Sequence, residues 1–150
     1  MHSDQQYWEA VQVCRERVQS LLAQAKKYWD ALPNIKSLVK KRDRVVRRFG
    51  HPRFTRRAGE VYEGRDSKVK QFYGDFRPFT AEVLTALEEL RSVLPEAEVE
   101  SLKREVHPST NIGGTYQALR RAAERLEEFW KCRPGQDTAL SDPLKGTLAG

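Results

Sequence analysis

Residues 7–32 read YWEAVQVCRERVQSLLAQAKKYWDAL, and apolar side chains recur in this stretch at alternating steps of four and three residues. The recurring positions are Tyr7, Val11, Cys14, Val18, Leu21, Ala25, Tyr28 and Leu32. Because an α-helix completes a turn about every 3.6 residues, this spacing places all of them on one face. The sequence therefore predicts a long first helix, capped by Ser3 or Asp4 and ended by Pro33, as the spine of a helical bundle.

The rest of the chain has the same periodicity in shorter segments. A second helix is expected over 34–49, followed by a basic loop or short helix up to residue 65, where Gly59 and Gly64 interrupt the pattern. Further helices are expected to begin at Asp66 or Ser67, at Thr80, at Glu96 and, after a Gly113–Gly114 hinge, near Thr115. No period-two alternation indicates a strand. We predict an all-α bundle of five or six helices over 1–132, with a polar tail over 133–150.

Composition narrows the possible functions. A chain of 150 residues with 39% hydrophobic content can bury one core but is short for two domains. Cys14 and Cys132 form no CxxC pair, so neither a zinc site nor a disulfide framework is predicted. Residues 1–7 lack the features of a signal peptide, and no stretch approaches the roughly 18 apolar residues that span a membrane. We therefore expect a cytoplasmic protein without a cofactor and without a role at a membrane.

The most informative feature for function is a run of positive charge. Between Lys36 and Arg57 the chain carries ten cations and a single acid, Asp43. Like charges crowded along a helix repel, and a polyanion would relieve that repulsion, although a solvated helical face is the usual explanation of a charged run. Arg42 lies beside the apolar stripe, so either its stem covers the apolar edge or its guanidinium bonds a specific partner. The predicted nucleic-acid interface comprises Lys36, Lys40, Lys41, Arg44, Arg47, Arg48, Arg53, Arg56 and Arg57.

Helical spacing brings the cations at 36, 40, 44, 47 and 48 to one side, where they can contact consecutive phosphates. Arginine suits this role because its planar fork makes bidentate phosphate contacts. Phe54, Tyr62 and Tyr73 lie in or next to the cationic region and could stack on unpaired bases, although a core position is favoured for Tyr73. The sequence predicts non-catalytic binding of RNA or DNA through the backbone, with weak sequence preference.

In size, all-helical layout and one-sided basicity, residues 7–130 resemble the small subunits of CRISPR effector complexes, which act in antiviral defence. The resemblance implies that the protein belongs to a larger ribonucleoprotein complex. It also implies that several copies stack head to tail, with residues 36–57 facing the nucleic acid and apolar or acidic surfaces facing neighbouring subunits.

Two other functions stay open. A protein-interaction module, such as an adaptor or a phage-encoded inhibitor, would dock the same cations on an acidic protein. Arg44 and His51 also have about the spacing of the arginine and histidine in HEPN ribonucleases. However, Val45 stands where that family has a polar residue, and Gly50 and Pro52 flank the histidine at a helix end. We therefore expect His51 to be structural or a phosphate contact, and we predict no catalytic residue.

Overall fold

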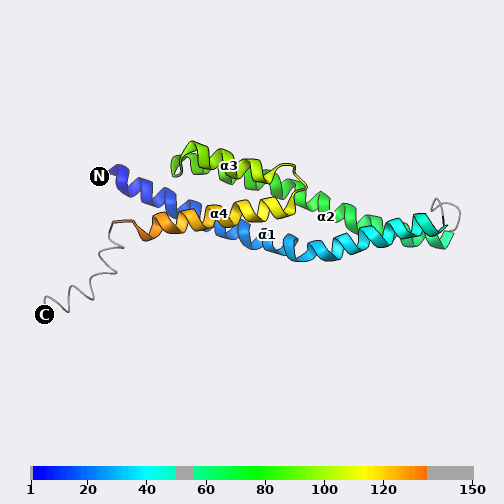
Figure 1. The fold of residues 1–150 in the computed structure, drawn as a ribbon. Helices are drawn as coiled ribbons and strands as arrows, with labels where there is room; N and C mark the ends of the chain where they lie inside the picture. Colours follow the sequence, from blue (N-terminus) through cyan, green and yellow to red (C-terminus); the bar gives the residue numbers. More distant parts are fainter. Residues whose placement is uncertain (1, 50–55, 135–150) are drawn as a thin grey trace, which may run out of the picture.

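The computed structural model describes residues 2–49 and 56–134, and all regular structure in these residues is helical (Figure 1). The described elements are α1 (His2–Phe49), α2 (Arg56–Glu89), the short 3₁₀ helix η2 (Leu90–Ser92), α3 (Glu96–Val106) and α4 (Ile112–Lys131). The predicted all-α class is confirmed. The predicted number of five or six helices is wrong, because four α-helices account for the described residues.

Two helices are longer than predicted because proline and glycine do not end them. The helix α1 continues through Pro33, and α2 continues through Pro78 and through both glycines at 59 and 64. A proline inside a helix costs about 3 kcal/mol, since it removes one hydrogen bond and crowds the preceding turn. The apolar stripe nevertheless stays in phase across Pro33, and Leu32 and Ile35 on either side of it pack against the core. Tertiary packing therefore outweighs the local penalty.

The predicted helix boundaries need three further corrections. Ser3 and Asp4 lie inside the first turn of α1 rather than before it, because α1 begins at His2. Thr80 lies within α2, where its buried hydroxyl donates to the Phe76 carbonyl at 3.0 Å. The Gly113–Gly114 pair is not a hinge, because both residues belong to the first turn of α4. A Cβ at Gly114 would overlap the carbonyl oxygen of Glu105, so glycine here allows α3 and α4 to approach closely.

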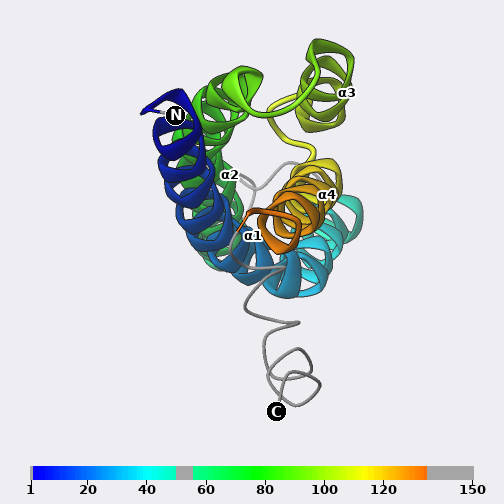
Figure 2. The same cartoon turned by 90° about the vertical axis from the view of Figure 1, so that its left-hand side faces the viewer.

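The core joins α1, α2 and α4, and α3 packs on α4 and α2. Seen from the end of the bundle, α4 lies between α1 and α3 (Figure 2). The helices α1 and α4 are antiparallel, since Trp8 contacts Trp130 and Trp29 contacts Tyr116. On another side of α1, the Tyr28 ring packs against Phe72, Phe76 and Phe79 of α2. The largest fully buried apolar side chains are Phe76, Leu87, Leu90, Leu119 and Leu126.

One end of the molecule consists of α1 and α2 alone. These two helices extend past the ends of α3 and α4, as Figure 1 shows. We call this part the arm and define it as residues 33–49 of α1 and 56–71 of α2. Among the arm residues whose burial the structure describes, the buried apolar side chains are Val45, Ala58 and Val69, and none of them belongs to the core cluster that joins the helices of the main bundle. The arm therefore has little apolar burial of its own.

Candidate nucleic-acid interface

The positive charge of the molecule is concentrated on the arm. The described arm residues include twelve lysines and arginines and only four acids. The remaining described residues, 2–32 and 72–134, include thirteen cations and fifteen acids. The fold thus separates a cationic two-helix arm from a main bundle of nearly balanced charge, which creates a directed electrostatic field.

Five arginines of the main bundle pair with glutamates of other elements. Arg15 of α1 donates to Glu127 of α4 at 2.8 Å, and Arg125 of α4 donates to Glu98 of α3 at 2.8 Å. Three further arginine–glutamate pairs between elements are Arg17 with Glu89, Arg91 with Glu100, and Arg121 with Glu105. Exposed pairs of this kind add little stability, but they cancel the positive field of the main bundle.

Most of the predicted interface residues have no such partner. Arg56 forms an i, i+4 ion pair with Glu60 at 3.2 Å. Arg48 is exposed and lines the cleft described below. In the part of the chain that the structure describes, six other exposed cations of the predicted interface have no carboxylate within ion-pair distance: Lys36, Lys40, Lys41, Arg44, Arg47 and Arg57. Arg53 and Phe54, which were also predicted, lie outside the described residues, as does His51.

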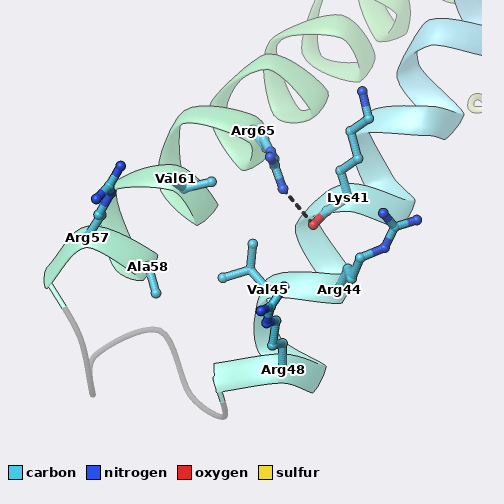
Figure 3. A pocket seen from close by; sticks show the side chains of 8 residues that line it. All are labelled: Lys41, Arg44, Val45, Arg48, Arg57, Ala58, Val61 and Arg65. Carbon is cyan, nitrogen blue, oxygen red and sulfur yellow. Dashed lines mark hydrogen bonds between the residues drawn. The ribbon is translucent and has the colours of Figure 1, made fainter.

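A cleft of about 570 Å³ opens between the two helices near the tip of the arm (Figure 3). Val45 of α1 faces Ala58 and Val61 of α2, and these three side chains form an apolar floor. The other lining residues are all cations, namely Lys41, Arg44, Arg48, Arg57 and Arg65. The cleft therefore joins sequence segments that are distant along the chain into one site with apolar and positively charged walls.

Two polar contacts link α1 to α2 beside the cleft. The Arg65 guanidinium donates to the Lys41 carbonyl oxygen at 2.8 Å, as the dashed line in Figure 3 shows. At the next residue of each helix, Arg42 donates to Asp66 at 2.9 Å, and it also donates to the neighbouring Asp43 at 3.2 Å. Arg42 therefore bonds a specific partner, which was one of its two predicted roles. It links α1 to α2 and is not part of the exposed interface.

The Arg42–Asp66 pair stays charged over a wide pH range. Burial lowers the pKa of Arg42, but hydrogen bonds from its guanidinium to Asp43 and Asp66 outweigh that effect and raise the pKa overall. The pKa of Asp66 is lowered, first because Lys70 bonds its carboxylate at 2.9 Å and also because Arg42 does so. This link between the helices of the arm therefore persists well below neutral pH.

The cations of α1 fall into two groups. Helical spacing places Lys36, Lys40 and Arg47 within about 40° of one another, on what we call the outer face of α1 in the arm. Lys41, Arg44 and Arg48 lie farther round the helix and line the cleft. The predicted single track is therefore wider than expected, because it includes both the outer face and the cleft.

The aromatic candidates are distributed differently from the prediction. Tyr73 packs against the core with its ring 5.2 Å from Phe72, which confirms the favoured core position. Tyr62 is half-buried within the arm. Trp29 was not among the predicted stacking residues, but it is 41% exposed and stacks on Tyr116 at the arm end of α4. Its position two helical turns before Lys36 could have indicated that Trp29 lies next to the cations. However, Trp29 also fits the apolar stripe of α1, which is typical of a core residue.

The described residues contain neither a metal-binding cluster nor a membrane-spanning helix. Across residues 2–49 and 56–134, no three His, Cys, Asp or Glu side chains gather in a way that would hold a metal ion. In the same ranges no helix is both long enough and apolar enough to cross a membrane.

Comparisons of the chain with protein-family models, with curated proteins and with solved structures found no match.

Proposed function

We propose that the protein binds RNA or DNA through the sugar-phosphate backbone, with the arm as the binding element. The supporting observation is the group of six exposed cations of the predicted interface that have no carboxylate partner among the described residues, on an arm with twelve cations and four acids. From Lys36 to Arg47 this surface extends about 16 Å along α1, which corresponds to about five phosphate steps of one strand in a duplex. Because phosphate contacts do not read base identity, sequence preference should be weak.

The test is a titration of labelled single- and double-stranded RNA and DNA in dilute salt. We expect binding to all of them with little dependence on sequence. Reversal of three arm charges, Lys40→Glu with Arg44→Glu and Arg47→Glu, should abolish binding without lowering the melting temperature, because exposed substitutions usually change stability by less than about 0.5 kcal/mol each. Normal binding by this variant would contradict the assignment of the arm.

The proposal includes the absence of a catalytic step. Incubation of the wild type with labelled RNA, with and without magnesium, should leave the RNA intact. Cleavage by the wild type that disappears in His51→Ala would instead favour the HEPN-like alternative, with Arg44 as the second residue to substitute.

A second candidate function follows from the apolar floor of the cleft. Val45, Ala58 and Val61 beneath a cationic rim would also accept an acidic amphipathic helix of a partner protein. The two candidates differ in their response to salt, because binding to nucleic acid weakens linearly on a log-log plot as counterions are released. A protein partner would remain bound after nuclease treatment of a lysate.

The resemblance to small subunits of CRISPR effector complexes stays a prediction, and so does the cytoplasmic location. If both are correct, the protein purified from its own cells should bring with it nucleic acid, other subunits and further copies of itself. Isolation of the protein alone and free of nucleic acid would argue against membership of such a complex.

A further inference from the structure

An aromatic pair of an exposed Trp29 and a half-buried Tyr116 lies where the first turns of α4 pack on α1. The Trp29 and Tyr116 rings are nearly parallel, with an interplanar angle of 10° and centroids 5.8 Å apart. The Arg120 guanidinium lies 5.8 Å from the centroid of Tyr116. Gly113 makes this arrangement possible, because a Cβ there would come within 3.1 Å of the Trp29 ring. The indole is thus held in place by α4 while 41% of the side chain remains exposed.

Trp29 belongs to the same face of α1 as the outer cations. The steps from Trp29 to Lys36, Lys40 and Arg47 are seven, four and seven residues, which keeps all four side chains within about 40° around the helix. At 1.5 Å per residue, Trp29 lies about 10 Å from Lys36 along the axis and about 27 Å from Arg47. The aromatic pair therefore lies in line with the cationic surface.

The cationic surface on this face of α1 stops where α4 begins to cover the helix. Towards the N-terminus of α1, α4 covers the face to which Trp29 belongs, with Arg15 bonded to Glu127 and Trp8 against Trp130. Beyond Trp29 the same face is uncovered and carries the cations of the arm. A strand that follows Arg47, Lys40 and Lys36 would therefore meet the aromatic pair at the edge of α4.

The charged residues next to the Trp29–Tyr116 pair would not repel a polyanion. Asp30, the acid that follows Trp29, bonds Lys26 at 2.9 Å. Arg120 adds a positive charge on the α4 side of the pair. An aromatic ring flanked by cations is the arrangement with which proteins bind unpaired bases, because every base has a π-face that can stack.

We infer that Trp29, supported by Tyr116, is a stacking platform for an unpaired base at the end of the cationic surface, so that the protein prefers single-stranded nucleic acid to duplex. This inference rests on the proposed function and adds the strand type to it. Bases in a duplex are already stacked and paired, so a duplex can use the arm cations but not the platform.

The experiment compares Trp29→Leu with Trp29→Phe and the wild type. Leucine keeps an apolar side chain against Gly113 but removes the ring, whereas phenylalanine keeps a ring that can stack. Each protein is titrated with three ligands of equal length, about 12 nucleotides. The ligands are a single strand, a duplex of the same sequence, and a strand with abasic sites in place of the bases.

We expect Trp29→Leu to lose about 5- to 150-fold in affinity for the single strand, which is the range for stacking on one base. Its affinities for the duplex and the abasic strand should equal those of the wild type, which also shows that the variant is folded. Trp29→Phe should keep most of the single-strand affinity. Tryptophan emission should fall when the single strand binds to the wild type, and this change should disappear in Trp29→Leu.

Two results would overturn the inference while the proposed function stands. One is unchanged single-strand affinity in Trp29→Leu, and the other is an equal loss for all three ligands, which would make Trp29 a purely structural residue. If the wild type binds none of the three ligands in dilute salt, the proposed function itself fails and the platform fails with it.

Discussion

Removal of two positive charges from the arm should change the salt dependence of binding by a calculable amount. The variant is Arg44→Gln with Arg47→Gln, which keeps a polar, unbranched side chain at each position and removes the charge together with the guanidinium. Six exposed cations of the predicted interface have no carboxylate partner in the described residues, so a single strand that contacts all six should show a log-log slope of about −4 against salt. Loss of two contacts should reduce that slope to about −2.8.

These slopes predict a measurable difference in affinity. Between 50 and 200 mM salt the wild type should lose roughly 300-fold in affinity and the variant roughly 50-fold. Fluorescence anisotropy with a labelled single strand at several salt concentrations gives both slopes. Thermal melting of both proteins confirms that the variant is folded.

The matched control removes two exposed charges far from the arm. Arg104 of α3 and Lys131 at the end of α4 are both exposed, and Arg104→Gln with Lys131→Gln gives the same net charge as the arm variant. This control should keep the wild-type slope, because its charges contact no phosphate. Equal slopes for the arm variant and the wild type would refute the assignment of the arm, and equal reductions in both variants would show that only net charge matters.

Three further predictions concern the fold. Leu21→Ala should lower the free energy of unfolding by about 2–5 kcal/mol in a denaturant titration, because Leu21 is 4% exposed and truncation leaves a cavity; a change below about 0.5 kcal/mol would contradict its buried position. Asp66→Asn should speed hydrogen exchange in the arm but not in the main bundle. In the wild type, the contribution of Asp66 to the stability of the arm should be complete above its usual pKa of about 3.9. It should be lost only as the pH falls through the lowered pKa of Asp66 in the folded protein. Protection of the arm from hydrogen exchange that already disappears near about pH 5 would contradict this expectation. A thiol reagent should label only the exposed Cys132 in the native protein, since burial raises the pKa of Cys14; prompt labelling of two thiols would show that α1 opens readily.

Periodicity predicted the buried side of the main bundle well. Every position of the first apolar stripe from Val11 to Ala25 is buried, and α3 begins at Glu96 and ends before His107, as expected. The breaks at Pro33 and Gly64 were wrong because the penalties of proline and glycine are local, about 3 and 1 kcal/mol. The packing that overrides them comes from residues of other helices, which no window of sequence contains.

The candidate site, like the fold, was predictable from the sequence only in part. The exposed cations were predictable because a dense run of one charge cannot be buried without partners. The cleft was not predictable, since it forms only when Val45 and Val61 face each other across two helices. The role of Arg42 depends in the same way on Asp66, 24 residues later in the chain. Trp29 was missed because an aromatic side chain in an apolar stripe has the same spacing whether it is buried or left at the end of a covering helix.

The low apolar burial of the arm bears on the meaning of its excess positive charge. Elsewhere the chain places glutamates opposite Arg15, Arg121 and Arg125, so mixed charge is available to this sequence. The arm instead carries twelve cations and four acids, so its like charges repel, and the described contacts that hold its helices together include the Arg42–Asp66 link and the Arg65 hydrogen bond. A bound polyanion would remove that repulsion and stabilise the arm by mass action. If the proposed function is correct, the charge pattern that destabilises the free arm is the same pattern that favours the complex.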